Sequence, residues 1–375
     1  MAESNLRTIG HGFDVGRLNQ GLGGQARLRA CAPVPTGNVG VGERRRDAMA
    51  PGMHRLALNL GLALLVALLF AGSLIAGKFW VPPAVWFSPD PRWWIIAELR
   101  LPRSILGLAI GAALGLSGAA LQGFLRNPLA DPAVVGVSSS AALGAVGAIV
   151  LLGSSAPLVL FGCAMAAACG SMLLLAGLAW RAESAVAFIL AGTVLASLGA
   201  ALTSFLISIA PNPYATAEIL DWIMGALTDR SFAEVQLALP FIAIGCALLL
   251  FTGRALDALT LGEAAARSMG VRLDRVQLLV VLGTGLAVGA SVAVTGIVGF
   301  VGLIVPHLLR PLTGARPSAL LLPSALGGAA LLLAADSLVR LSPGPSEVRL
   351  GVAMALLGTP FFFVLLLKLR RSTWN

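Results

Sequence analysis

The 375-residue chain is 57% hydrophobic and only 11% charged, with a mean hydropathy of +0.89. This balance cannot cover a water-exposed surface, so it excludes a soluble globular domain and indicates an integral membrane protein. The net charge of +9 would suit nucleic-acid binding in a polar chain. In a chain this apolar, we expect no nucleic-acid partner, and we expect the basic residues to set the membrane topology.

Residues 1–50 are rich in Gly and Arg and contain no apolar run, so they are predicted to form a disordered N-terminal tail. The first apolar segment comes only after Arg55 and is too long for a signal peptide. Residues 51–375 are predicted to form one polytopic transmembrane domain.

A membrane-spanning helix needs about 20 mostly apolar residues, and by that criterion the chain contains about ten. The predicted spans are 56–76, 104–124, 133–153, 157–180, 185–209, 235–253, 276–295, 297–312, 318–338 and 350–368. The predicted fold class is therefore an all-α integral membrane protein. An even number of spans places both ends of the chain on one side of the membrane.

Basic residues set the predicted orientation. They cluster before the first span and after the last one, at Arg44, Arg45, Arg46, Arg55, Lys368, Arg370 and Arg371. The positive-inside rule then places both termini in the cytoplasm. The same topology puts Arg100 and Arg103 at the outer face, with Arg340 and Arg349 near the last outer loop.

Small residues recur in the second span, where Gly107, Gly111 and Gly115 are spaced by four. Such a stripe lets helix backbones approach closely, so it predicts a tightly packed bundle.

Two loops carry possible recognition elements. The inner segment Arg254 to Arg275 predicts a short helix from Glu263 to Met269 between Gly262 and Gly270, which is either a solvated connection or a docking element for a cytoplasmic partner. The outer segment Pro211 to Phe232 mixes apolar and acidic residues. It predicts an interfacial helix with Trp222 as its membrane anchor, or alternatively the lining of a vestibule.

Few residues suggest chemistry. Asp336 is an acid inside the ninth span, and Arg340 one turn later makes a structural ion pair the favoured interpretation over a proton relay. His307 is interpreted as a hydrogen-bonded structural residue, and the four cysteines, Cys31, Cys163, Cys169 and Cys246, have no ligand spacing. The sequence has no phosphate loop and no hydrolase motif, so no catalytic residue and no metal site are predicted.

Six motifs together resemble one family, the iron-chelate uptake permeases of bacterial ABC importers, whose members carry ferric siderophores, haem or cobalamin. The motifs are LRLPR (99–103), the run from Gly111 to Pro132 with LSGAALQGFLRNPLADP, GVSSSAALGA (136–145), LGEAAARSMGV (261–271), GFVGLIVPHLLRPLTG (299–314) and ADSLVR (335–340). The resemblance covers residues 55–371 in matching order.

The resemblance implies a ten-helix permease of the type II kind, similar to cobalamin importers, in the bacterial inner membrane. It implies a homodimer with a path along its axis, two cytoplasmic ATPase subunits beneath it and a periplasmic substrate-binding protein above it. ATP and Mg²⁺ would then be held by the ATPase, so no cofactor is expected on this chain and the chain is not expected to be an enzyme.

The resemblance also implies roles for two sets of residues. Outer arginines of this family meet acidic residues of the binding protein, a role that falls on Arg100, Arg103 and Arg340. Arg349 departs from the family pattern and either adds a fourth docking charge or extends to the outer interface. The coupling helix that sits in the ATPase is assigned to Gly262, Glu263, Ala264, Ala265, Ala266, Arg267, Ser268, Met269 and Gly270.

The cargo is predicted from the outer segment AEILDWIMGALTDRS (217–231), which looks most like haem-importing members. None of the three histidines, His11, His54 and His307, lies at the predicted outer face, which suits a carrier that must release its load. Ferric siderophore and cobalamin stay open as cargo. A proton-coupled secondary transporter acting through Asp336 is the distant alternative, and a membrane enzyme is the least favoured class.

Overall fold

The computed structural model describes residues 51–179, 185–343 and 347–372, and every regular element in these ranges is helical. The prediction of an all-α membrane protein is confirmed. The predicted tail, residues 1–50, lies outside the described residues. The elements are α1 (Pro51–Ile75), η1 (Pro83–Val85), α2 (Arg92–Trp94), η2 (Ile95–Arg100), α3 (Leu101–Phe124), α4 (Val137–Leu151), α5 (Pro157–Ala179), α6 (Ala185–Ser208), α7 (Pro213–Ile223), α8 (Phe232–Phe251), α9 (Gly253–Leu259), α10 (Glu263–Ser268), α11 (Leu273–Thr295), α12 (Val301–Leu309), η3 (Arg310–Thr313), α13 (Pro317–Arg340) and α14 (Leu350–Ser372).

Each of the ten predicted spans corresponds to an apolar helix, but the helices differ in length. Within the described ranges, 7 helices are long and apolar enough to cross a membrane. Three shorter apolar helical stretches are Val137–Leu151, Val301–Thr313 and Leu350–Leu365, the last of which lies within the longer helix α14. A helix rises about 1.5 Å per residue, so α4 with its 15 residues falls short of a hydrocarbon core about 30 Å thick. Such a short helix spans the hydrocarbon core only together with the loops at its ends.

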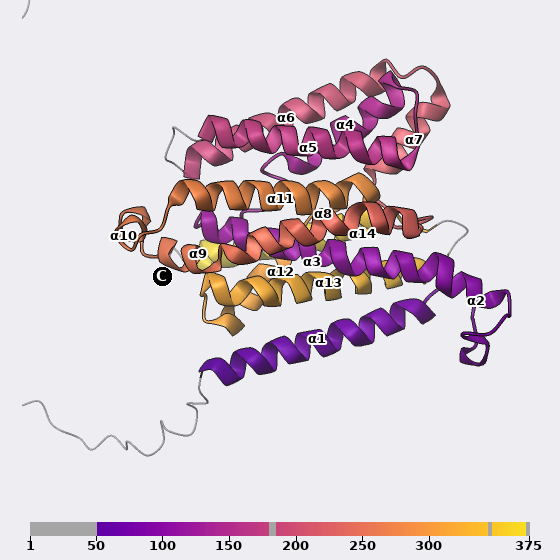
Figure 1. Cartoon of the computed structure of the whole chain (residues 1–375), viewed down its shortest axis with the longest axis horizontal. Coiled ribbons are helices and arrows are strands. Elements are labelled where there is room, and N and C mark those ends of the chain that lie inside the picture. Colours follow the sequence, from indigo (N-terminus) through magenta and orange to yellow (C-terminus); the bar gives the residue numbers. More distant parts are fainter. Residues whose placement is uncertain (1–50, 180–184, 344–346, 373–375) are drawn as a thin grey trace, which may run out of the picture. The chain divides into compact units, whose positions relative to one another are not determined.

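The long helices lie side by side, so the bundle has two ends (Figure 1). The start of α1, the end of α14 and the short helices α9 and α10 lie at one end, which we call the terminal end. The short helices α2 and α7 lie at the other, which we call the distal end. The start of α1 and the end of α14 therefore share a side, as an even number of crossings requires.

Helices α3 and α13 form the central pair of the bundle. A Cβ added to Gly111 would collide with the backbone carbonyl of Gly328, and one added to Gly115 would collide with that of Ser324. The predicted glycine stripe therefore marks the place where two helix backbones touch. In α3, 83% of the most apolar window is buried, which is the highest share among the long helices of the described chain.

The chain between α11 and α12 crosses the distal half of the bundle without helical structure. Gly296 and Phe300 bound this stretch with φ angles of 73° and 68°. Neighbouring backbone encloses it, because a Cβ added to Gly225 or to Gly351 would collide with the carbonyl oxygen of Ile297. Irregular backbone at membrane depth is tolerated only where protein surrounds it in this way.

Candidate functional site

Four charged side chains form a cluster where the distal ends of α3 and α13 meet, and we call it the distal ion cluster. Arg103 Nη2 lies 2.8 Å from Asp336 Oδ1 and 2.9 Å from Glu347 Oε2. Arg340 pairs with Asp336 through Nη2, and its Nε lies 2.9 Å from Asp336 Oδ2. Asp336 is 1% exposed, so two guanidiniums from different helices neutralise one buried acid.

The interpretation of Asp336 and Arg340 as a structural ion pair is confirmed. The sequence did not indicate Arg103 as the second partner. Arg103 lies 233 residues away, and no spacing rule connects two helices that meet only in the folded chain. The Asp336 carboxylate is fully occupied by these contacts.

Two arginines also fasten the distal end of α1 to the bundle. Arg100 donates to the carbonyls of Leu74 and Ile75 at 3.0 and 2.9 Å, and Arg340 donates to that of Ser73 at 2.9 Å. The last carbonyls of a helix lack partners within the helix and carry its negative dipole end, so a guanidinium stabilises them. Only 11% of the α1 window is buried, and these polar contacts secure it where apolar packing is sparse.

The four arginines that the resemblance assigns to docking differ in accessibility. Arg100, Arg103 and Arg340 are 6%, 8% and 3% exposed and are bonded within the chain. Arg349 keeps 32% of its side chain exposed and lies 2.8 Å from Asp221. The docking role stays a prediction for all four, and of the four Arg349 is the one whose charge is accessible in the single subunit.

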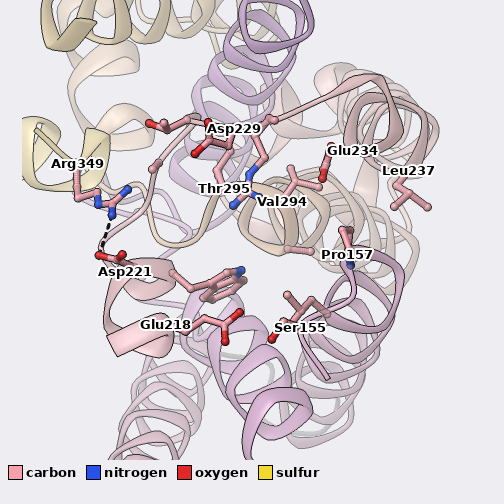
Figure 2. A pocket seen from close by; sticks show the side chains of 16 residues that line it. Ser155, Pro157, Glu218, Asp221, Asp229, Glu234, Leu237, Val294, Thr295 and Arg349 are labelled. Carbon is pink, nitrogen blue, oxygen red and sulfur yellow. Dashed lines mark ion pairs between the residues drawn. The ribbon is translucent and has the colours of Figure 1, made fainter. Parts of the chain in front are cut away.

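A pocket of about 290 Å³ opens beside Arg349 at the distal end (Figure 2). Its walls come from the α4–α5 loop, α7, the start of α8 and the end of α11. Trp222 lines it and is 9% exposed, because Ile219 and Trp222 turn the buried face of α7 toward the bundle. Of the two alternatives that the sequence left open, the lining of a vestibule fits the buried position of Trp222, and an anchor at the lipid interface does not.

The pocket carries more negative than positive groups. Its charged lining residues are Glu218, Asp221, Asp229, Glu234, Arg230 and Arg349. Burial lowers the pKa of Arg230, while the nearby carboxylates of Glu234 and Asp229 oppose that shift. The pocket therefore presents a net negative surface with one half-buried cation, Arg230, inside it.

The predicted short helix at the terminal end is present as α10, from Glu263 to Ser268, with Met269 as its C-cap rather than its last residue. Gly262 and Gly270 flank it with φ angles of 97° and 83°, conformations that glycine adopts at little cost. The residues assigned to the coupling helix divide by exposure. Ala266 is buried, Gly262, Glu263 and Ala265 are half-buried, and Ala264, Arg267, Ser268, Met269 and Gly270 are exposed.

A second short helix, α9, precedes α10 and was not predicted. Leu256 and Leu259 on α9 are buried at 0% and 2%, and its Asp257 carboxylate accepts from the backbone N–H of Ser318 at 2.8 Å. Next to α9, Arg126 from the loop after α3 lies 2.9 Å from Glu263 of α10. The terminal end therefore presents a small structured element rather than a flexible loop.

Metal and cofactor chemistry receive no support from side-chain clusters. Among the residues that the structure describes, no group of three or more His, Cys, Asp or Glu could hold a metal ion. The ring of His307 packs against that of Phe361 with their centroids 6.0 Å apart. The expectation that this chain binds no cofactor stays an expectation.

Comparison with known proteins identifies the family. The FecCD transport family matches residues 64–368. The vitamin B12 import system permease protein BtuC of Klebsiella pneumoniae is 36% identical over 319 residues, which are 84% of this chain and 95% of that protein. The Fe(3+) dicitrate transport system permease protein FecD of Escherichia coli is 35% identical over 84% of this chain and 100% of its own length.

A solved structure has the same fold. It is a metal-chelate type ABC transporter in an inward-facing conformation, 33% identical, with a TM-score of 0.76 over 83% of this chain and 99% of that one. The family model, the two relatives and the solved structure agree. The chain belongs to the FecCD transport family, the membrane permeases of iron-chelate and cobalamin ABC importers.

Proposed function

We propose that this chain is the permease subunit of an ATP-driven bacterial importer that moves haem from the periplasm to the cytoplasm by alternating access. The observation that carries the proposal is the match of the whole helical unit to a metal-chelate type ABC transporter. The absence of a phosphate loop from the sequence means that another chain must hydrolyse ATP. The fold then supplies the path, and the partner ATPase supplies the energy.

The proposed assembly contains two copies of this chain, two ATPase subunits and one binding protein in the inner membrane. The terminal end faces the cytoplasm in this proposal. Exposed basic residues at that end support it under the positive-inside rule, namely Arg254, Arg267, Arg272 and Arg275. Apolar side chains of α6 such as Leu190 and Phe205, each 60% exposed, offer a face for the second copy or for membrane lipid.

Helix α10 is the proposed contact with the ATPase. One side of α10, which carries Ala264 and Arg267, is exposed to solvent. The neighbouring Leu261 and Met269 are 69% and 54% exposed. A partner can therefore reach this side of α10. Closure of the ATPase pair on ATP would displace α10. That displacement would change the path from one orientation to the other by rigid-body movement of helices.

Docking of the binding protein is proposed at the distal end, near Arg349. Reversing its charge with Arg349→Glu should weaken binding-protein affinity roughly tenfold at low salt, because a rim charge acts through long-range attraction. The defect should shrink as salt is raised. Surface plasmon resonance on nanodisc-embedded permease checks this, with Arg92→Glu, an exposed distal residue, as the control.

Either of two results would contradict this docking site. Affinity of the Arg349→Glu variant equal to that of the unmodified chain would remove Arg349 from the interface. An equal loss in the Arg92→Glu control would show a general charge effect rather than a docking contact.

The cargo is the least constrained part of the proposal. The resemblance of residues 217–231 to haem importers favours haem, while the names of the relatives include vitamin B12 and ferric dicitrate. Uptake by proteoliposomes that contain the permease, its ATPase and its binding protein should be measured with haem, cobalamin and a ferric siderophore. Haem is expected to accumulate fastest. Preferential uptake of another chelate would keep the machine and replace the cargo.

A proton-coupled carrier acting through Asp336 is the second candidate, and the contacts of Asp336 weigh against it. Its carboxylate is bonded to Arg103 and Arg340. Both oxygens of this carboxylate accept hydrogen bonds from guanidiniums, whereas a proton relay needs a carboxylate that can bind and release a proton during each cycle.

A further inference from the structure

Two polar contacts at the terminal end join the α9–α10 segment to the central pair of helices, and we call them the terminal clamp. The first is the pair between Arg126 and Glu263, whose Nη2 and Oε1 atoms lie 2.9 Å apart. The second is Asp257, which accepts from Ser318 N at 2.8 Å and from Ser318 Oγ at 2.6 Å.

The Arg126 contact connects α10 to the end of α3. Arg126 is the second residue after Phe124, where α3 ends, and it has a φ of 50°, a left-handed conformation that is uncommon outside glycine. The backbone N–H of Asn127 returns to Gln122 O at 3.2 Å, so the turn is closed onto the last turn of α3. The backbone of Arg126 is thereby fixed, and its side chain reaches Glu263 from this closed turn.

The Asp257 contact connects α9 to the start of α13. Ser318 is the second residue of α13, and the first N–H groups of a helix have no partner within it. The N-cap residue, Arg316, makes no side-chain capping bond, so Asp257 supplies the acceptor that an N-cap side chain would normally provide. A carboxylate at this position also faces the positive end of the helix dipole.

Helices α3 and α13 are themselves held together along their length. Their backbones touch at Gly111 and Gly115, and their distal ends share the Arg103–Asp336 pair at 2.8 Å. Close backbone contact and a buried ion pair leave little room for one helix to slide past the other. The pair therefore has one polar clamp at each end and a packed seam between them.

We propose that Arg126, Glu263 and Asp257 are positioning residues that make α10 move together with the α3–α13 pair. A displacement of α10 would then reach the distal ion cluster, where α1, α3 and α13 meet, without any change in their mutual packing. This inference rests on the proposed function, because it takes α10 as the element that the ATPase moves. It assigns the relay to the central pair rather than to the peripheral helices.

The first test is a charge exchange. Arg126 and Glu263 have 42% and 35% of their side chains exposed, and surface pairs of this kind add little to folding stability. Arg126→Glu and Glu263→Arg should therefore leave the bundle folded. Each should lower the amount of cargo transported per ATP hydrolysed by about threefold or more, and the double exchange should restore it to within about twofold.

Arg254→Glu is the matched control for this exchange, because Arg254 is an exposed cation of α9 outside the clamp. The amount of cargo that this variant transports per ATP hydrolysed should equal that of the unmodified chain. If Glu263 instead contacts the ATPase directly, the double exchange will not restore coupling. That result, or unchanged coupling in both single variants, would overturn the proposal.

The second test asks whether the clamp moves. In a background without the native cysteines, Arg126→Cys and Glu263→Cys are joined by a short bifunctional reagent. Because both substitutions remove the ion pair, uptake per ATP should be low before crosslinking, and it should rise after crosslinking because the two positions are proposed to move as one. Uptake that is lost or does not rise, with the ATPase still bound, would contradict the proposal, and each single-cysteine variant treated with the reagent is the control.

The third test needs no transport. The Ser318 amide should exchange hydrogen for deuterium faster in Asp257→Ala than in Asp257→Asn, because asparagine keeps an acceptor oxygen. Equal exchange in the two variants would remove Asp257 from the clamp.

Uptake by the unmodified assembly distinguishes a failure of the proposed function from a failure of the clamp. Uptake that does not need ATP would overturn the proposed function itself. ATP-driven uptake that is insensitive to the clamp variants would overturn the clamp alone.

Discussion

Replacing Asp336 with alanine is expected to lower the free energy of unfolding by about 3 to 5 kcal/mol, because it leaves a buried arginine without its counter-ion. Asp336 is the only acid that an ion pair links to Arg340 among the described residues, and Arg340 is 3% exposed. Arg103 retains Glu347 after the substitution. The unpaired charge therefore falls on Arg340, which keeps its hydrogen bond to the carbonyl of Ser73.

Unfolding of the purified chain in mixed detergent measures this effect. Glu347→Ala is the matched control, since it removes the other acid of the distal ion cluster from a site with 24% of its side chain exposed. The expected cost for Glu347 is below about 1 kcal/mol. Equal stability of the two variants would contradict the account of the cluster.

Replacing Gly115 with leucine is expected to destabilise the fold by at least about 3 kcal/mol, because overpacking a rigid contact forces backbones apart. The nearest atoms to the new side chain belong to the backbone of Ser324, and a backbone cannot rotate away as a side chain can. The α3–α13 seam would open. The variant should fail to accumulate as a monodisperse species after detergent extraction.

Gly170→Leu is the control for this seam. Gly170 lies within α5, and a Cβ there would meet nothing within 4 Å. The cost of changing glycine to leucine in a helix is thus separated from the cost of closing the contact. Size-exclusion profiles that are equally disturbed in both variants would contradict the role of the seam.

The features predicted correctly from sequence are those with a local signal. The apolar runs locate the helices, because length and hydropathy act within one segment. Gly262 and Gly270 locate α10, since glycine marks a chain that leaves the helical region. Asp336 and Arg340 are found as a pair because they are one helical turn apart.

The features that sequence missed depend on contacts between distant segments. Asp257 lies on α9 and caps the start of α13. The sequence around residue 257 contains no signal that its carboxylate accepts a hydrogen bond from a helix that begins 60 residues later. A topology prediction gives the depth of Arg100 and Arg340 in the membrane but not their neighbours. It predicted their placement at the outer face but not that the end of α1 covers them.

The two alternatives for Trp222 stayed open in the sequence for a related reason. A tryptophan in a mixed apolar and acidic segment favours the membrane interface by composition. The face that it occupies is decided by packing, since Ile219 and Trp222 lie on the side of α7 that turns inward. Composition alone cannot distinguish a helix on lipid from a helix on protein.

The most direct test of the central claim is uptake of haem by proteoliposomes that hold the permease with its binding protein, measured with active ATPase, with an ATPase unable to hydrolyse ATP, and without ATPase. The account predicts uptake only with the active ATPase. Comparable uptake without it, driven by a proton gradient, would contradict the assignment of this chain as the permease of an ATP-driven importer.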